Sequence, residues 1–388
     1  MFGQNFASLS DSFHSSRPVK RFTHNFYRYP ARCSDEFAHD VIREFTAPDH
    51  IVMDPFIGGG TTVVEGLALG RRCIGVDVNQ LACFVTQVKT TPLSRGDRFD
   101  IAAFLDRIRL DRAYGGTTPA LDDRRTKNLP EPIKHAIGTA LSWVDVLAYP
   151  RQKRFIRCLL LRTAQQLLDC RDEVPGLDLI HERIRTMSQE MFDGLDEFVE
   201  ACRAHGLGKN LITAHRTIVH RSAVGLDSDR RLLPFIGRVN LVFTSPPYPK
   251  VHVLYHRWQI RGRKETPAPF WISGLNDGQG AKYYTFGSRT PTGLKNYFGT
   301  VSEAFRSIRP FLQHDAHVVQ LLGFSEPPTQ LPAYLGAMTD AGYQLLYTTY
   351  GDREDFPWRK VPNRRWYTRN QPNQNTSAEV LLIHRPKR

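Results

Sequence analysis

Short apolar runs alternate with amphipathic segments at both ends of the chain, whereas in the middle the apolar residues recur at helical spacing. Residues 1 to 20 are expected to be a loose polar arm. Residues 33–50 are expected to contain a helix that Ser34 can cap and that ends before Pro48. Further along, we expect a strand at 50–54, a helix at 62–70, a strand at 72–77 and a helix at 79–89. The order strand, glycine turn, helix, strand predicts the opening of a doubly wound α/β sheet.

The pattern changes near residue 95. Residues 95–130 are mixed and charged, and three long segments between 133 and 205 have apolar residues at helical spacing. We interpret this part as a helical insertion. α/β character then returns, with strands expected at 211–220, 238–245, 316–324, 343–350 and 378–385 and helices at 296–312 and 330–342. The residues 249–293 and 351–377 are expected to be basic loops.

Charge and cysteine content narrow the function classes. The 388 residues include 52 Lys and Arg against 39 Asp and Glu, a net charge of +13. Such a charge indicates a polyanionic partner, although a generically basic protein is the alternative. Six scattered cysteines without a C-x-x-C pair argue against a zinc ribbon or a disulfide framework. No apolar run is long enough for a membrane span and no signal core is present, so we expect a cytoplasmic protein without a membrane partner.

The stretch "DPFIGGGTT" places Asp54 at a strand's carboxyl end and glycines 58–60 in the following turn. Glycines there let a ligand approach the backbone. A Walker loop is absent, and Val63 stands where a dinucleotide fingerprint needs its third glycine. Asp77 follows Gly58 by 19 residues, a distance suited to ribose hydroxyls. With Asp54 as an acceptor for a cationic or NH-bearing group, these residues suit an adenosine joined to an amino acid. A tight turn with a capping aspartate is the structural alternative.

Two motifs carry a resemblance to a known family. "DPFIGGGTT" resembles the D-P-F-x-G-x-G-T-T cofactor motif of the amino-methylating DNA methyltransferases, and "TSPPY" at 244–248 resembles their catalytic motif in its cytosine-N4 form. Residues 23–42 are similar to the family segment that closes over the methionine end of S-adenosylmethionine. The resemblance covers 20–90 and 212–388. It implies a seven-stranded Rossmann-like, S-adenosylmethionine-dependent methyltransferase fold, with the helical part as an insertion.

The resemblance also implies site residues and a division of the chain. The residues expected to bind S-adenosylmethionine are Tyr29, Pro30, Asp54, Pro55, Phe56, Gly58, Gly60, Thr61, Thr62, Asp77, Asn79 and Thr244. The catalytic residues are Ser245, Pro246, Pro247 and Tyr248. Residues 1–94 would form the arm and the cofactor half, 95–210 the insertion, and 211–388 the catalytic half. Ser222 stands where the family commonly has an acid that touches the adenine, so the adenine contacts stay unassigned.

The catalytic motif suits methyl transfer to a ring amine. The Ser245 hydroxyl and the Pro246 carbonyl can accept hydrogen bonds from the amine, which localises its lone pair. Tyr248 offers a face for a base flipped out of the duplex. No metal or covalent nucleophile is needed, and a plain proline turn is the alternative. Serine at the first motif position favours N4-methylcytosine. Adenine-N6 methylation, RNA base methylation and a DNA-binding module with an inactive site are the rival readings.

Basic residues among aromatics follow the catalytic turn and recur near the end of the chain. Those expected to bind DNA phosphates are Lys250, Arg257, Arg261, Arg263, Arg364 and Arg365. Solvated charged loops are the alternative. His252 and His256 have metal-ligand spacing without a third ligand, so no metal is expected. The expected partners are double-stranded DNA and a cognate restriction endonuclease encoded separately, and the chain is expected to be a monomer or a homodimer.

Overall fold

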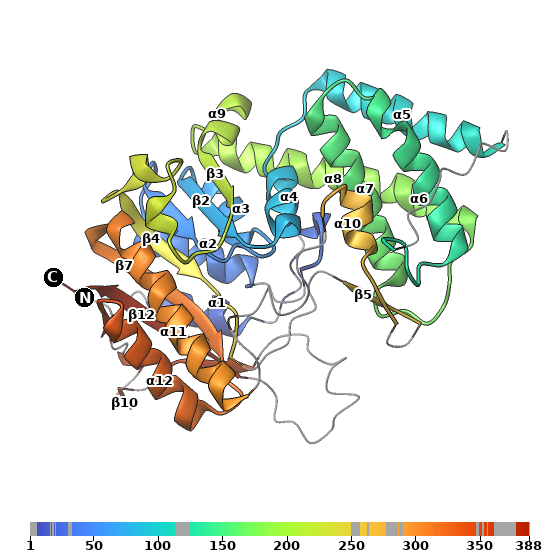
Figure 1. The fold of residues 1–388 in the computed structure, drawn as a ribbon. Coiled ribbons are helices and arrows are strands. Elements are labelled where there is room, and N and C mark those ends of the chain that lie inside the picture. The colour runs from blue at the N-terminus through green and yellow to red at the C-terminus, as the bar shows by residue number, and fades with distance from the viewer. Residues whose placement is uncertain are drawn as a thin grey trace.

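The computed structural model shows an α/β unit with a group of helices beside it (Figure 1). It describes residues 6–15, 17, 19, 21–29, 33–113, 124–249, 257–261, 264–276, 286, 290–346, 349–350, 353–354, 356–360 and 378–387. The first strand of the chain, β1, and the last, β12, lie in the same sheet. The helical group is therefore an insertion between strands of that sheet.

One sheet forms the centre of the α/β unit, with the order β11–β12–β7–β4–β1–β2–β3 and with β8 also paired to β12. Its strands are β1 Ile51–Asp54, β2 Arg72–Asp77, β3 Arg216–His220, β4 Val239–Thr244, β7 Leu312–Gly323, β8 Tyr343–Leu346, β11 Trp358–Lys360 and β12 Ala378–Pro386. β3, β2, β1, β4 and β7 are parallel, and β12 is antiparallel to its neighbours.

This sheet confirms the Rossmann-like fold. The order β3–β2–β1–β4 is that of a doubly wound sheet, in which the first strand is central. The sheet has eight strands where seven were expected, because the short β8 and β11 both pair with the edge of β12 that faces away from β7. Every residue of β1 is buried, as a central parallel strand covered on both faces requires.

Three helices lie next to β1 and β2 in the chain, and side chains cap two of them. They are α2 Asp35–Phe45, α3 Thr61–Ala68 and α4 Gln80–Lys89. The Ser34 hydroxyl caps α2 by accepting the backbone N–H of Phe37 at 3.5 Å, and the Asn79 side chain caps α4 by accepting that of Leu81 at 2.9 Å. Each cap satisfies an N–H that has no partner inside its helix, and the cap of α4 fixes the first turn of that helix just after the end of β2.

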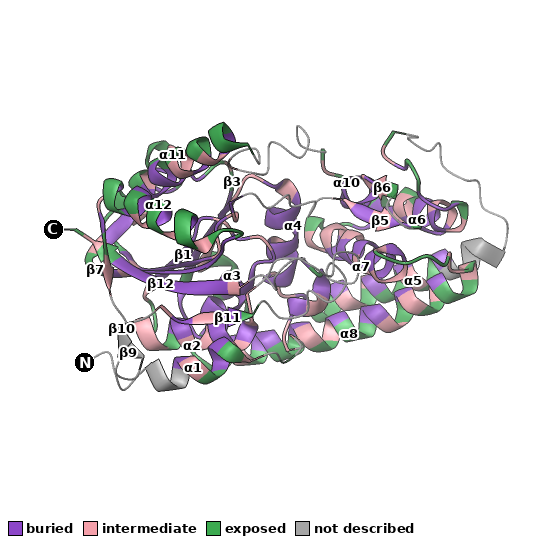
Figure 2. Cartoon of the chain, turned by 90° about the horizontal axis from the view of Figure 1, so that it is seen from below, coloured by how far each residue is buried: buried purple, intermediate pink, exposed green. Residues whose placement is uncertain are grey.

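Two layers of helices cover the sheet. α1 Phe6–His14 and α2 lie on one face, where Leu9, Phe13 and Phe37 pack with residues of β1, β4, β7 and β12. α11 Pro291–Ile308 and α12 Pro327–Asp340 cover the other face. Figure 2 shows the strands buried between these layers and the outer sides of α11 and α12 exposed. The predicted polar arm is therefore wrong over 6–14, where a helix forms because its apolar side chains have a sheet to pack on.

The helical group contains α5 Arg95–Ala113, α6 Glu131–Trp143, α7 Pro150–Leu168, α8 Leu177–Ala204 and α9 Lys209–Ala214. A segment expected to be a basic loop joins it, with β5 Trp258–Ile260, β6 Lys264–Thr266 and α10 Ala268–Ser273. Trp258 is buried and donates to the Tyr27 hydroxyl at 3.2 Å. The predicted boundaries at 94/95 and 210/211 stay a prediction, since a part of the C-terminal half also packs here.

β9 Thr349–Tyr350 and β10 Arg353–Glu354 form a two-stranded ribbon outside the main sheet. Among the residues that the structure describes, no helix combines the length and the apolar character that crossing a bilayer would require.

Candidate active site

Three turns meet at the carboxyl edge of the parallel strands. β1 ends at Asp54, β2 at Asp77 and β4 at Thr244. Because β1 pairs in parallel with β2 on one side and with β4 on the other, these three ends are neighbours. β1 is also where the strand order changes direction, with β2 and β3 on one side and β4 and β7 on the other. Doubly wound sheets bind ligands at such a point.

Asp54 connects the glycine turn to the catalytic strand. One carboxylate oxygen accepts the Thr62 hydroxyl at 2.7 Å, and the other accepts the Thr244 hydroxyl at 2.6 Å. The backbone N–H of Phe56 also donates to this carboxylate, at 3.1 Å. Burial raises the pKa of Asp54 to about 6, although these hydrogen bonds act in the opposite direction. The acid is therefore held rigidly and titrates close to neutral pH.

The glycine turn needs its glycines for two different reasons. Gly58 has a φ of +45° and lies against the Tyr29 ring, and Gly60 has a φ of +79° at the start of α3. A Cβ on Gly60 would lie 2.5 Å from the Thr86 hydroxyl oxygen. Buried Lys89 supports the turn by donating to the Gly59 carbonyl at 2.7 Å. The turn is thus fixed from beneath by α4.

Asp77 and Asn79 form the neighbouring turn. The Asp77 carboxylate accepts the backbone N–H of Gly58 at 2.9 Å and that of Asn79 at 2.8 Å. Burial raises its pKa to about 6 against the effect of these N–H groups. The Asn79 side chain donates to the Tyr29 hydroxyl at 3.1 Å while it caps α4. The structure therefore brings Tyr29, Gly58, Asp77 and Asn79 together.

Residues 245–248, which we call the catalytic turn after the prediction from the sequence, are held by residues from later in the chain. The Ser245 hydroxyl donates to the Leu321 carbonyl at 3.1 Å and lies 3.2 Å from the Tyr248 hydroxyl. Tyr248 donates to a carboxylate oxygen of Glu379 at 2.5 Å. Tyr297 donates to the Pro247 carbonyl at 2.7 Å. The turn is therefore fixed at three of its residues by partners on β7, β12 and α11.

Glu379 is itself neutralised by an arginine. Arg359 donates to the second oxygen of Glu379 through two nitrogens, at 2.9 and 2.8 Å, and both side chains are buried. Arg359 also donates to the Phe13 carbonyl at 3.0 Å and lies over the Phe13 ring. The catalytic turn is thereby linked through one buried ion pair to α1.

Sequence reasoning missed four residues that support the site: Lys89, Tyr297, Arg359 and Glu379. Two of them carry a local signal, because Lys89 is a cation at the end of a buried apolar helix and Glu379 an acid in an apolar strand. Buried charges are rare unless they are paired. Their partners come from distant segments, so the pattern identifies an unusual residue without naming what it binds.

A small cavity joins the cofactor motif to the catalytic motif. It measures about 30 Å³ and is lined by Cys33, Asp54, Phe56, Ile57, Gly58, Gly59, Thr61, Thr62, Phe243, Thr244, Ser245 and Leu321. Pro55 and Pro246 are buried in the turns beside it. Of the predicted cofactor-binding residues, only Pro30 lies outside the described residues.

A buried ionic cluster anchors the segment that carries Tyr29. Glu65 on α3 is ion-paired with Arg21 and hydrogen-bonded to His24 at 2.7 Å and His39 at 3.0 Å. Burial alone would raise the pKa of Glu65, but His24, His39 and the Arg21 charge lower it to about 2. His24, Asp35 and Glu65 could offer a metal three ligand atoms, the only such group among the described residues. Arg21 already pairs with both carboxylates and supplies the positive charge there.

The predicted DNA-binding residues are only partly described. Lys250, Arg263, Arg364 and Arg365 lie outside the described residues, as do His252 and His256. Arg257 is 3.8 Å from the Glu265 carboxylate, and Arg261 occupies the exposed turn between β5 and β6 with a φ of +43°. The structure places both on the hairpin that packs against α7. Among the described residues, it shows no contact between these two arginines and the turns that follow β1, β2 and β4.

Comparison with known proteins identifies the N-terminal segment. Residues 4–87 match the DNA methylase family. The chain is 38% identical over 78 residues to the Type II methyltransferase M.MvaI of Kocuria varians, covering 19% of this chain and 17% of that protein. It is 25% identical over 75 residues to the Type II methyltransferase M.MjaII of Methanocaldococcus jannaschii, covering 19% and 14%. A putative methylase YubD of Escherichia coli is 50% identical over 38 residues, covering 10% and 17%.

The similarity to these relatives is confined to a short stretch, which spans less than a fifth of the length of each. Among solved structures, a geranyl diphosphate methyltransferase in complex with GPP and sinefungin aligns with a TM-score of 0.34 and 11% identity, covering 91% of this chain and 79% of that one. The rRNA methyltransferase aviRa of Streptomyces viridochromogenes aligns with a TM-score of 0.33 and 12% identity, covering 93% and 89%. The match over residues 4–87 includes the glycine motif and the segment before it, so this part of the chain is similar to the amino-methylating DNA methyltransferases.

Proposed function

We propose that this chain transfers the methyl group of S-adenosylmethionine to the exocyclic N4 amine of a cytosine flipped out of duplex DNA. The observation that carries the proposal is the double hydrogen bond of Asp54. It joins Thr62 of the glycine turn to Thr244, the residue before Ser245, so that both motifs line one cavity. The similarity of residues 4–87 to the DNA methylase family supports the reaction class.

The residues present fit the cofactor. Asp77 is oriented by two backbone N–H groups, which leaves lone pairs on its carboxylate for the ribose hydroxyls. Asp54 uses three of about four acceptor positions, so one remains for an N–H of the cofactor. The cavity beside Asp54 has room for about one water molecule, so it takes only a small part of the cofactor.

Ser245 prepares the amine. When bound, the cofactor supplies a sulfonium methyl that the amine nitrogen takes, while the carbon–sulfur electron pair returns to sulfur and an amine proton is lost to solvent. The Ser245 hydroxyl has two acceptors within the protein for its only hydrogen, the Leu321 carbonyl and the Tyr248 hydroxyl, so its lone pairs can accept an N–H of the base. That hydrogen bond localises the nitrogen lone pair toward the methyl group, and fixed positioning then carries the rate.

The Tyr248–Glu379 hydrogen bond fixes the aromatic ring of the catalytic turn. A ring held at its hydroxyl presents a stable face to an extruded base, and stacking on it is tolerant of base type. The choice of cytosine therefore rests on serine at position 245 and is the finer part of the proposal. Adenine-N6 methylation of DNA and base methylation of RNA are alternative outcomes of the same test.

The test uses tritiated cofactor with duplex DNA, duplex RNA or protein as acceptor, followed by digestion of the labelled nucleic acid to nucleosides. Label in N4-methylcytosine is expected. Label in N6-methyladenine would replace the proposed base, and label confined to RNA or protein would overturn the DNA substrate. Single-molecule sequencing of DNA from an expressing host would give the modified base and its sequence context together. The separately encoded endonuclease, and the choice between monomer and homodimer, stay predictions.

A further inference from the structure

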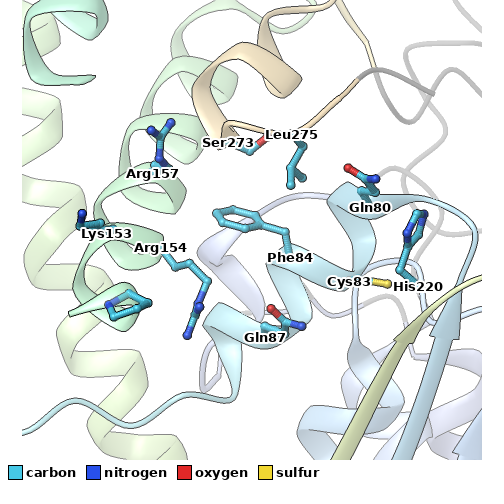
Figure 3. Close-up of a pocket in the computed structure, with 11 residues that line it drawn as sticks. Gln80, Cys83, Phe84, Gln87, Lys153, Arg154, Arg157, His220, Ser273 and Leu275 are labelled. Carbon is cyan, nitrogen blue, oxygen red and sulfur yellow. The ribbon is translucent and has the colours of Figure 1, made fainter. Parts of the chain in front are cut away.

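A second and much larger cavity lies between the α/β unit and the helical group (Figure 3). It measures about 450 Å³. Its lining comes from α4, the first turns of α7, the end of α10 and the last residue of β3: Gln80, Cys83, Phe84, Gln87, Pro150, Lys153, Arg154, Arg157, His220, Ser273 and Leu275. We call it the Arg154 pocket. Of the residues predicted from the sequence to bind cofactor or DNA, none that the structure describes lines it.

The charged residues that line the Arg154 pocket in the described part of the chain are all positive. They are Lys153, Arg154 and Arg157, and no described aspartate or glutamate lines it. Two of the three cations have partners, because Lys153 donates to exposed Asp145 at 3.1 Å and Arg157 donates to the Ile272 carbonyl at 3.0 Å.

Arg154 differs from its neighbours. Within the described part of the chain it makes no hydrogen bond or ion pair, and its Nε is buried without a partner. Figure 3 shows its side chain reaching from α7 toward α4, on the side of Gln87. Burial lowers the pKa of Arg154. Burial also lowers the pKa of Arg216, and the charge of Arg154 adds to this effect. A partly buried guanidinium surrounded by other cations is costly until an anion joins it.

The Arg154 pocket adjoins the proposed cofactor site. Gln80 follows Asn79 directly, and His220 is the β3 partner of Asp77. The Cys83 thiol lies 3.8 Å from the Asp77 carbonyl oxygen. The pocket and the proposed cofactor site both lie at the carboxyl edge of the parallel strands, so a phosphate of a DNA strand that crosses this edge can meet the unpaired positive charge of Arg154.

We propose that the Arg154 pocket binds a phosphodiester group of the DNA strand that carries the target base, with Arg154 as the charged donor. This inference rests on the proposed function for the identity of the polyanion. It assigns to the helical group a contact with substrate that neither basic loop predicted from the sequence provides. A planar guanidinium suits a phosphate because it can donate two parallel hydrogen bonds.

The test compares the salt dependence of duplex DNA binding in three full-length variants. Arg154→Gln removes the proposed contact, Arg154→Lys keeps its charge, and Arg185→Gln removes one charge from an exposed position on α8. Each phosphate contact contributes about 0.9 to the slope of log affinity against log salt. We expect Arg154→Gln to lose about that much slope, while Arg154→Lys and Arg185→Gln keep the wild-type value. Equal slopes for Arg154→Gln and wild type would overturn the proposal.

Two further measurements separate the alternatives. If adenosine monophosphate binds the wild type and not Arg154→Gln while the DNA slopes are equal, the cavity is a free-nucleotide site and the proposal is overturned. Methyl transfer to DNA by the wild type is measured independently. If Arg154→Gln changes the salt slope but the wild type transfers no methyl group, the proposed function is overturned and the phosphate contact is kept. If the wild type transfers methyl groups but the slopes are equal, the proposed function is kept and the phosphate contact is overturned.

Discussion

Two regions of this molecule bury charge, and they compensate it differently. At the strand edge, Asp54 and Asp77 each accept several hydrogen bonds from the chain itself. In the Arg154 pocket, three cations lie together, and none of the described lining residues is a carboxylate. A charge with internal partners is already oriented for a small ligand, whereas a charge without them depends on a ligand for compensation. The difference separates a preorganised site from one that its partner completes.

The largest effect is expected when a buried charge loses the partner that the chain supplies. Glu379→Ala would leave the Arg359 side chain, which is 4% exposed, without its carboxylate. Breaking such a buried pair costs about 3–5 kcal/mol of the free energy of unfolding. Urea denaturation measures it, with Glu200→Ala at an exposed pair with Arg203 as the matched control, for which a change of about 0.2–1 kcal/mol is expected. Similar losses for both variants would contradict the role given to Arg359.

Ser245→Ala should reduce methyl transfer by about 100-fold or more, because one preorganised hydrogen bond to the reacting group is lost. Cofactor affinity should stay within about twofold, since the hydroxyl bonds to Leu321 rather than to the cofactor turns. Single-turnover kinetics and equilibrium binding measure the two effects. Ser228→Ala, at an exposed position, is the control. Undiminished transfer would remove Ser245 from the mechanism.

Asp77→Ala should weaken cofactor binding by about 10- to 100-fold, the range for a hydrogen bond to a charged group. Titration calorimetry measures it, and Asp227→Ala, an exposed acid after β3, controls for the change in net charge. Asp77→Asn keeps the side chain's size and an acceptor for Gly58, so it should lose less than Asp77→Ala. If both variants bind as the wild type does, the ribose contact is elsewhere.

Stability and cofactor affinity should both depend on pH. Since the pKa values of Asp54 and Asp77 are raised to about 6, both carboxyls bind protons more readily in the folded protein than in the unfolded chain. They stabilise the protein below their unfolded pKa, and this stabilisation is lost as pH rises through 6. Cofactor binding needs the charged forms, so its affinity should fall by about tenfold per pH unit below 6 for each acid involved. A flat profile between pH 5 and 7 would contradict these roles.

The sequence predicted the residues at the carboxyl ends of the strands better than the residues that hold the catalytic turn in place. Asp54, Gly58 and Asp77 lie within one strand–turn–helix–strand unit, where strand ends and turn residues are set by neighbours in the chain. The Asp77 bond to the Gly58 N–H is an example, because 19 residues of regular structure bring the two together. Glu379 and Tyr297 act on the catalytic turn from 131 and 50 residues away, and no local pattern specifies such pairings.

The missed helix α1 shows a second limit. Its segment is short and polar, with Leu9 and Phe13 four residues apart as the only periodic signal that proved to matter. An isolated helix of this length is marginal in water. Packing on Phe37 and the hydrogen bond that Arg359 donates to the Phe13 carbonyl stabilise it. Tertiary contacts from the other end of the chain therefore decide its structure.

The bond between Asp54 and Thr244 spans 190 residues, and this has a consequence for biosynthesis. At about 5–20 residues per second, a ribosome delivers Thr244 roughly 10–40 s after Asp54. During that interval β1 can pair with β2, while the apolar edge that β4 will cover stays open. The helical group emerges in the meantime and can pack against α3 and α4. The glycine turn is thus among the first parts of the nascent chain to form and among the last to be closed.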